Sequence, residues 1–304
     1  MKYLFIFSML SLTAYSQNDN QYKIQGLYDI GYSANNLGYY DIAINAFSEA
    51  LILDSMNLSC IANRAYSYNA IENYELSIQE YTNAIGIKPY PLFYNMKGLS
   101  YGELGLYEKA IDDFDSAIEM NDSLPYAYYN KGRMLYLLNQ IPNAISYHQT
   151  ALSLVDAVDE RADMLNSLAK IYFDIEDYQN SLKLFKEIIT LNYESSFTYL
   201  RIGDINRRLE NTSESIDAYD KAIAYEDVNP LAYLYRGKMK FMSVDDWADS
   251  KSDLQKYIEL VPEDPEGYSS LGGLLWFLED PQYCDYLKMA CERGECMLFN
   301  EMCK

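Results

Sequence analysis

Residues 91–124 read PLFYNMKGLSYGELGLYEKAIDDFDSAIEMNDSL, and this stretch predicts two short amphipathic helices joined by a turn. The first helix is expected over residues 92–104 and the second over residues 107–121, because apolar residues recur there at helical spacings of three, four and seven. Gly105 separates them, since glycine readily adopts the positive φ that ends a helix. Gly98 is small where the two helices must touch, which allows their axes to approach closely.

The same unit recurs along the chain. Small residues that correspond to Gly98 are separated by 34, 33, 34, 37, 34, 34 and 35 positions. These markers are Gly31, Ala65, Gly98, Gly132, Ala169, Gly203, Gly237 and Gly272. An aromatic or aliphatic residue lies four positions before each marker, and small or aromatic residues recur 12, 16 and 19 positions after it. Such a period predicts stacked helical hairpins that bury their apolar faces on one another.

This pattern resembles the tetratricopeptide repeat (TPR), a helix–turn–helix unit of about 34 residues. The resemblance covers residues 24–292 in eight units. It implies an all-α, right-handed TPR solenoid of about eight helix–turn–helix units. A polar lead at residues 17–23 precedes the solenoid, and a C-terminal capping helix within residues 293–304 follows it.

The period is interrupted in the later units. An insertion around residues 159–161 precedes the fifth unit and is expected to lengthen a turn. The seventh unit has an extra loop residue near Trp247, whose indole is expected to pack in the turn. In the eighth unit, counting places Lys288 in the aromatic position and Cys284 and Cys291 in small-residue positions that face neighbouring helices.

Residues 1–16, MKYLFIFSMLSLTAYS, are typical of a secretory signal peptide: a lysine, an apolar run and a small-x-small cleavage site ending at Ser16. The apolar run is shorter than the roughly 20 residues that a transmembrane helix needs. We therefore expect an exported protein, periplasmic or secreted after cleavage near Ser16, with no membrane span. An uncleaved N-terminal anchor is the alternative.

The chain is strongly acidic, with 45 Asp and Glu residues against 24 Lys and Arg and a net charge of −21. This charge disfavours binding to nucleic acid or to anionic lipid. The acidic run at residues 112–115 lacks the glycine and spacing of a calcium loop, so we expect a solvated helix face. The single histidine, His148, takes an aromatic position and is expected to pack in the core; no cofactor or metal is expected.

The C-terminal stretch, residues 283–304, contains four of the five cysteines: Cys284, Cys291, Cys296 and Cys303. Their spacing is seven, five and seven residues. A spacing of seven places Cys284 and Cys291 on one face of a first helix, and Cys296 and Cys303 on one face of a second helix. A turn between the two helices would bring Cys291 beside Cys296 and Cys284 beside Cys303. We predict two disulfides that hold a capping helix over residues 295–303; four reduced thiols are the alternative. Cys60 is expected to be a lone buried thiol.

The resemblance implies a non-enzymatic scaffold whose concave groove, lined by the first helices, binds a protein or peptide. In many family members an asparagine two positions before the marker faces this groove. Asn63 and Asn130 match that position, whereas Asn95 and Asn166 lie one position earlier.

Basic residues also occupy groove positions in units four to seven: Arg133, Lys170, Arg201, Arg207 and Lys238, with Arg208 beside them. We infer a preference for an acidic segment or a free C-terminal carboxylate, which arginine binds well. The alternative is that these cations neutralise acidic residues of the second helices. Four cations that directly precede their markers are expected to pair locally instead: Arg64, Lys97, Lys131 and Arg236.

Two other functions stay open. A cell-envelope assembly factor or chaperone would use the same groove for many weak clients. A carboxylate-based hydrolase is less favoured, because no pair of acids stands out and the sequence lacks a Gly-rich phosphate loop, HExxH and GxSxG.

Overall fold

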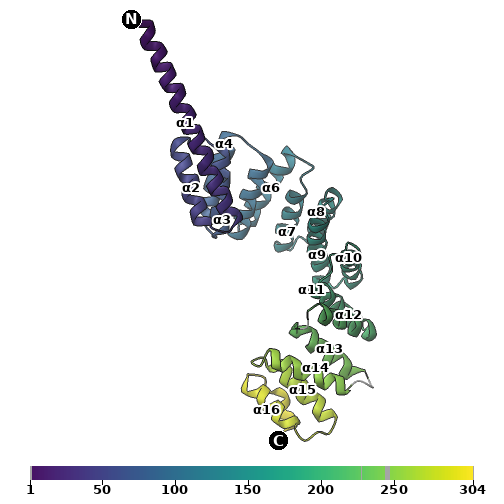
Figure 1. Ribbon diagram of the computed structural model, residues 1–304. Helices are drawn as coiled ribbons and strands as arrows, with labels where there is room; N and C mark the ends of the chain where they lie inside the picture. The colour runs from purple at the N-terminus through teal and green to yellow at the C-terminus, as the bar shows by residue number, and fades with distance from the viewer. Residues whose placement is uncertain (1, 227, 244–246, 304) are drawn as a thin grey trace. The chain divides into compact units, whose positions relative to one another are not determined.

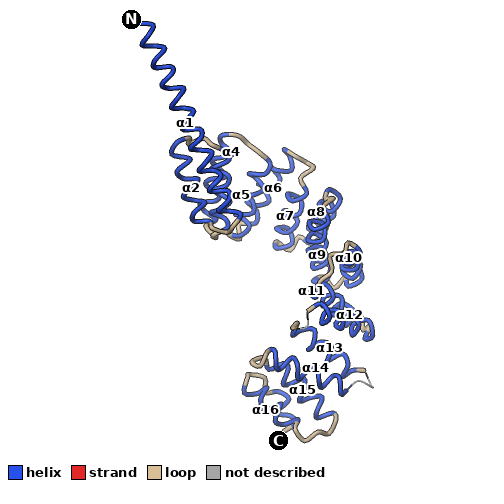
Figure 2. Tube along the Cα trace, in the orientation of Figure 1, coloured by secondary structure: helices blue, strands red, loops and turns tan. Residues whose placement is uncertain are grey.

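The computed structural model describes residues 2–226, 228–243 and 247–303, with the backbone alone for residues 2–18. The described residues form helices joined by short turns, with no strand among them (Figure 2). The helices are α1 (Lys2–Asn36), α2 (Tyr40–Leu53), α3 (Leu58–Ala70), α4 (Tyr74–Ile87), α5 (Pro91–Glu103), α6 (Tyr107–Met120), α7 (Pro125–Leu137), α8 (Ile141–Leu154), α9 (Val158–Asp174), α10 (Tyr178–Thr190), α11 (Ser196–Arg208), α12 (Thr212–Tyr225), α13 (Pro230–Met242), α14 (Trp247–Leu260), α15 (Pro265–Phe277), α16 (Tyr283–Glu292) and α17 (Met297–Met302).

The chain divides into two compact units, Met1–Val155 and Asp156–Lys304. The first unit contains α1 to α8 and the second contains α9 to α17 (Figure 1). From α1 to α16, odd-numbered helices are the first helices of their repeats and even-numbered helices are the second helices. No helix in the described ranges is long and apolar enough to cross a bilayer. The signal peptide expected at residues 1–16 lies where the structure describes no side chains, so it stays a prediction.

In the repeats whose marker is a glycine, the helical pair packs through a contact between the marker and a large residue of the second helix. A Cβ added at Gly98 would lie 2.7 Å from Phe114 Cε1, and one added at Gly203 would lie 2.5 Å from Tyr219 Cε1. Phe114 and Tyr219 are fully buried. This contact confirms that the markers are small because the neighbouring helix approaches them closely.

His148 takes the place of this ring in the fourth repeat. It is fully buried, meets the Tyr129 ring edge-on with centroids 5.3 Å apart, and has Nδ1 2.9 Å from the carbonyl oxygen of Ala144. Burial lowers the pKa of His148 below its usual value, although the backbone hydrogen bond opposes this shift. The predicted packing role is confirmed.

The turns within the repeats that the structure describes share a residue with positive φ. Gly105 has φ +73°, as the sequence predicted, and the equivalent residues Glu72 and Asn139 have φ +62° and +58°. A non-glycine residue in this left-handed region costs about 1–2 kcal/mol, so packing of the flanking helices imposes the turn.

The insertion before the fifth repeat extends a helix and does not lengthen a turn, so that prediction was wrong. Helix α9 has 17 residues, against 13 in α7 and α11. Asp159 and Glu160 lie in its first turn, where acidic residues favour helix formation. Arg161 forms an ion pair with Glu187 of α10 at 2.8 Å, which fixes the added turn.

The last repeat is one residue out of the expected register. A Cβ added at Gly272 would lie 2.5 Å from Leu287 Cδ2, so Leu287, and not Lys288, occupies the large position, 15 residues after the marker. Cys284 and Cys291 therefore lie one position beyond the small-residue positions and are half-buried, which corrects their predicted placement against neighbouring helices.

The seventh repeat follows the expected register. Leu254 packs on Gly237, 17 residues after it, as one extra loop residue requires. The Trp247 ring, at the start of α14, lies 5.4 Å from the ring of Phe277 at the end of α15, so the indole packs within the chain. Residues 244–246 lie outside the described residues.

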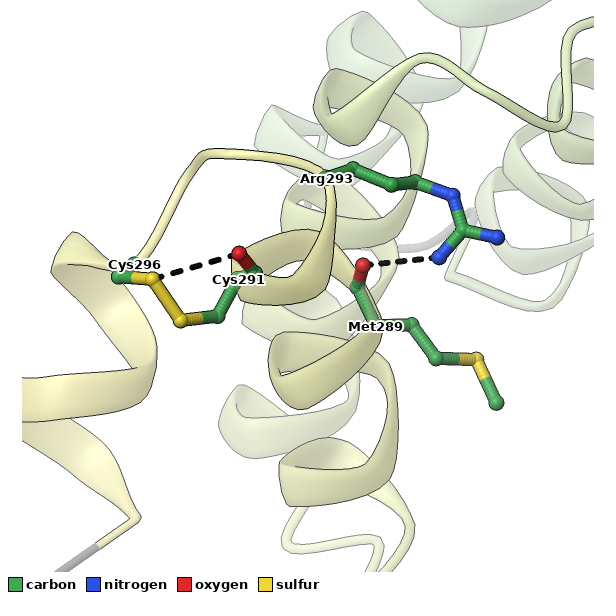
Figure 3. Close-up of a disulfide and its surroundings, with 4 residues drawn as sticks. All are labelled: Met289, Cys291, Arg293 and Cys296. Atoms are coloured by element: carbon green, nitrogen blue, oxygen red, sulfur yellow. Dashed lines mark hydrogen bonds between the residues drawn. A yellow bond between two sulfur atoms is a disulfide. The ribbon is translucent and has the colours of Figure 1, made fainter.

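Helix α17 begins at Met297, two residues later than expected, and contains no buried residue. The structure pairs Cys284 with Cys303 and Cys291 with Cys296, with Cα atoms 5.6 Å and 4.0 Å apart, which matches the expected pairing. Figure 3 shows the inner pair beside Arg293, which donates to the carbonyl oxygen of Met289 at 2.9 Å. A hydrogen bond from the Tyr283 hydroxyl to the Met302 carbonyl oxygen also connects α16 to α17.

The cations that precede the markers pair with acids of the second helices, as predicted. The bonds are Arg64–Glu80, Lys97–Asp113, Lys131–Asp115, Arg236–Asp220 and Arg236–Asp253. The acidic run at residues 112–115 is not wholly solvated, because Asp113 is only 7% exposed. Burial raises the pKa of Asp113, and the hydrogen bond and charge of Lys97 oppose that rise.

Candidate functional site

Three first helices of the second unit, α11, α13 and α15, pack in sequence and carry charged residues around Tyr235. We call this group the Tyr235 cluster. Its members are Arg201, Asp204, Arg207, Tyr235, Lys238 and Glu266.

Most charges of the Tyr235 cluster are neutralised within it. The guanidinium carbon of Arg207 lies 5.5 Å from the centre of the Tyr235 ring, and the same side chain pairs with Asp204 one turn earlier. Lys238 reaches from α13 to Glu266 of α15. Burial raises the pKa of the Tyr235 hydroxyl, and the charges of Glu266 and Asp204 add to that rise. Ion pairs therefore connect neighbouring residues of α11 and bridge α13 to α15.

Arg201 is the exception in the Tyr235 cluster. Its guanidinium carbon lies 4.9 Å from the centre of the Phe197 ring, and no carboxylate of the described residues is within ion-pairing distance. Arg201 is half-buried and Phe197 is 44% exposed. A partly desolvated guanidinium supported by a ring can bind a carboxylate through two parallel hydrogen bonds.

The other cations expected in the groove are not members of the Tyr235 cluster. Arg208 is exposed at the end of α11. Lys170 of α9 pairs with Asp174 on its own helix at 3.1 Å, and Asn166 is half-buried on the same helix. Arg133 belongs to the first unit, where its guanidinium carbon lies 5.8 Å from the Tyr129 ring centre.

The asparagines expected to meet a peptide in the first unit bond within the chain. Asn130 Nδ2 donates to Asn95 Oδ1 at 3.1 Å, and these residues are only 4% and 3% exposed. Asn63 Nδ2 donates to the carbonyl oxygen of Ser59, one turn back on the same helix. The amides of Asn95 and Asn130 connect α5 to α7, and neither is open to a partner in this structure.

Exposed apolar side chains lie at the C-terminal ends of α13 and α15, two of the helices that carry the Tyr235 cluster. Met242, Trp276 and Phe277 are 71%, 49% and 51% exposed. Phe241 follows Lys238 by one turn on the same face of α13, and its ring meets Phe277 edge-on at 5.5 Å. The first helices of this unit thus offer both a cation and exposed aromatic surface.

The described residues bring together no group of three or more His, Cys, Asp or Glu that could hold a metal ion.

Family models of the tetratricopeptide repeat match residues 95–157, 162–195 and 198–229. The chain is a tetratricopeptide repeat protein. Tetratricopeptide repeat protein 6 of Homo sapiens is 24% identical to it over 209 residues, which cover 66% of this TPR chain and 39% of that protein. A TPR repeat-containing protein of Methanocaldococcus jannaschii is 24% identical over 196 residues, or 62% and 34% of the two chains. The TPR chain thus spans well under half the length of these relatives.

Solved structures share the fold. The C-terminal part of a TPR repeat-containing protein from Cytophaga hutchinsonii matches with a TM-score of 0.65 and 15% identity, over 80% of this chain and 99% of that one. YrrB, described as a TPR protein with an unusual peptide-binding site, matches with a TM-score of 0.53 and 17% identity, over 62% and 96%. The all-α TPR solenoid is therefore confirmed. TPR repeats are typical of protein–protein interaction scaffolds.

The aromatic members of this TPR surface were not predicted. Phe197 precedes Arg201 by four residues, a spacing that places both on one helix face. Tyr235 carried no distinguishing signal, because 32 tyrosines recur throughout the chain.

Proposed function

We propose that this TPR protein is a non-enzymatic scaffold that binds a partner segment on the first-helix face of its second unit. Arg201 binds an acidic side chain or the C-terminal carboxylate of that segment. The observation that supports this is the unpaired guanidinium of Arg201 among the described residues, beside cations that are already paired. A carboxylate gains most where no acid of the chain competes with it.

The paired cations have a different role in this proposal. Arg207 and Lys238 bond to Asp204 and Glu266, which lie on first helices, whereas the alternative interpretation expected partners on second helices. The Lys238–Glu266 pair links α13 to α15, whereas the Arg207–Asp204 pair lies within α11, and neither engages Arg201, which is left as the free anchor. A partner segment would then extend from Arg201 toward Trp276 and Phe277.

Fluorescence anisotropy with labelled acidic peptides tests this function. Each peptide is compared with a free and an amidated C-terminus, which separates terminal from side-chain carboxylates. Arg201→Glu is expected to weaken binding about 10- to 100-fold, since a charge-assisted hydrogen bond contributes about 1.5–3 kcal/mol. Lys183→Glu, an equal charge change at an exposed position of α10, is the control. Equal affinity of Arg201→Glu and the unchanged chain would refute the proposal.

A chaperone or assembly factor for envelope proteins is a second candidate, favoured by the exposed apolar side chains of Met242, Trp276 and Phe277. Such a protein would bind many unfolded clients weakly, whatever their charge. Trp276→Ala would then reduce suppression of client aggregation, whereas Arg201→Glu would not. The reverse result favours a single acidic partner.

We also propose that the chain is exported and that its four C-terminal cysteines are oxidised. Residues 1–16 would be removed, so N-terminal sequencing should begin at Gln17, and fractionation should place the protein outside the cytoplasm. Thiol titration of the unfolded chain should find one reactive thiol, from Cys60, which the structure leaves unpaired and buried. Five reactive thiols, or a retained Met1, would contradict this proposal.

A further inference from the structure

Four repeats place a cation directly before the marker, between the second helices of neighbouring repeats. Lys131 bonds to Asp115 of α6 and to the Tyr147 hydroxyl of α8, and Arg236 bonds to acids of α12 and α14. In three of the four repeats a tyrosine ring of the chain also lies against the cation. The distances from the cation to the ring centre are 5.5 Å for Lys97 and Tyr94, 4.4 Å for Lys131 and Tyr147, and 5.5 Å for Arg236 and Tyr233.

The second repeat lacks this ring. Ile61 stands where Tyr94 and Tyr233 stand in their repeats, four positions before the marker. Arg64 Nη1 donates to Ser48 Oγ at 3.0 Å, and Nη2 pairs with Glu80 at 2.7 Å. No aromatic ring of the described residues covers the Arg64 guanidinium, so its charge is paired while its flat face has no ring against it.

A groove lies at this place between α2 and α4, with Arg64 and Ile61 of α3 among its lining residues. Its volume is about 600 Å³, within the range of ligand-binding pockets, and Leu51, Ile52 and Ile87 supply apolar walls. The groove is open beside Gly86, where an added Cβ would meet nothing within 4 Å. We call this space the Arg64 groove.

We propose that the Arg64 groove binds a neutral aromatic side chain of a partner polypeptide, in the place that tyrosine rings of this chain take beside Lys97 and Arg236. The negative face of an aromatic ring complements a guanidinium, and its edges complement the aliphatic walls. An anionic ligand is disfavoured, because Glu80 already pairs with Arg64 and the chain has a net charge of −21. This site is separate from Arg201 and its test does not depend on the proposed function.

Nuclear magnetic resonance of the full chain with labelled isoleucine methyl groups tests the site. The probe is 4-methylphenol, which reproduces the tyrosine side chain. Saturable shifts are expected at Ile52, Ile61 and Ile87, which line the groove. The non-aromatic analogue 4-methylcyclohexanol should bind at least fivefold more weakly. Absence of saturable shifts, or equal binding of the two probes, would overturn the proposal.

Variants locate the binding. Ile61→Tyr supplies the ring from the chain itself, as in the third and seventh repeats, and should abolish 4-methylphenol binding. Gly86→Leu fills the groove from α4 and should do the same if Ile61→Tyr alters the fold. Ile42→Tyr, at a position of α2 that is 53% exposed, is the matched control and should bind normally. Undiminished binding by folded Ile61→Tyr or Gly86→Leu would overturn the proposal.

A final comparison tests whether the bound ring belongs to a polypeptide or to a small molecule. The blocked peptide Gly-Ser-Tyr-Ser-Gly should shift the same methyl groups at least as strongly as 4-methylphenol does. The same peptide with leucine in place of tyrosine should bind at least fivefold more weakly. If only the free phenol enters the groove, the site takes small aromatic molecules and the polypeptide occupant is ruled out.

Discussion

Where a marker glycine packs against a buried ring, a single residue is decisive for the stability of the repeat. We expect Gly98→Ala to destabilise the first unit by about 1–3 kcal/mol, the usual cost of overpacking. The added Cβ would lie 2.7 Å from Phe114 and 3.1 Å from the Ala110 carbonyl oxygen, and the backbone atom cannot swing away. The change in free energy of unfolding is measured by urea titration monitored by circular dichroism.

Gly86→Ala is the control for that experiment, because its Cβ would have open space. An alanine in a helix is favoured over glycine by about 0.5–1 kcal/mol, so this variant should be neutral or slightly more stable. Equal effects of Gly86→Ala and Gly98→Ala would contradict the packing argument.

The buried pair of Lys97 and Asp113 gives a prediction about pH. Burial raises the pKa of Asp113, so the folded chain holds this proton more tightly than the unfolded chain does. Ionisation of Asp113 therefore lowers the free energy of unfolding. This loss of stability grows as pH rises from the pKa of the unfolded chain, about 3.9, through the pKa of the folded chain. Lys97→Met removes the bonded cation and should cost about 3 kcal/mol near neutral pH.

That cost should shrink as pH falls, because Asp113 becomes protonated and no longer needs Lys97. Urea unfolding of Lys97→Met and of the unchanged chain, at neutral and at mildly acidic pH, gives the difference in their free energies of unfolding at each pH. The double variant Lys97→Met/Asp113→Asn should show little of the cost at either pH. A difference between Lys97→Met and the unchanged chain that stays constant with pH would contradict the role of Asp113.

Sequence periodicity predicted some of these residue roles and missed others. The position of Lys97 before a marker predicted its local pairing, since the period fixes which helix lies opposite. The same period predicted Arg207 and Lys238 at the groove, but not their bonds to Asp204 and Glu266. Such bonds depend on side-chain reach across helices, which residue spacing does not specify.

At the scale of elements, we expect the terminal helix α17 to depend on the pairing of Cys284 with Cys303. None of its residues is buried, so packing contributes little to holding it on α16. We expect Cys284→Ser/Cys303→Ser to release α17, with amide hydrogen exchange there rising to within about tenfold of an unfolded peptide. Hydrogen-exchange mass spectrometry measures this.

Exchange in α15, which contains buried residues along its length, should not change in the same variant. Cys60→Ser is the control, because Cys60 pairs with no other cysteine. Continued protection of α17 in this variant would show that a link between Cys284 and Cys303 is not what holds the helix.

The order and number of the helices were predictable because each period of about 34 residues corresponds to one helical hairpin. Register in the last repeat was not, because Cys284 and Cys291 fit small-residue positions by size alone. Leu287 is the residue buried under Gly272, and only the three-dimensional packing distinguishes it from Lys288. Likewise, the sequence placed an insertion before the fifth repeat but could not show that it extends α9.

At the scale of the whole molecule, the division at residues 155 and 156 bears on how the chain unfolds. In repeat proteins stability is roughly a sum of repeat and nearest-neighbour terms, so a junction can separate two cooperative blocks. We therefore expect two unfolding transitions in urea, one for each unit.

The two tryptophans allow these transitions to be assigned. Trp247 and Trp276 both lie in the second unit, so their fluorescence reports that unit, whereas circular dichroism reports all helices. The Cβ of Gly203→Ala would lie 2.5 Å from Tyr219, so this variant should shift the urea midpoint measured by fluorescence. Gly98→Ala should shift only the midpoint measured by circular dichroism. If Gly98→Ala moves both signals equally, the units unfold as one block, because a change confined to the first unit would then have reached tryptophans that only the second unit contains.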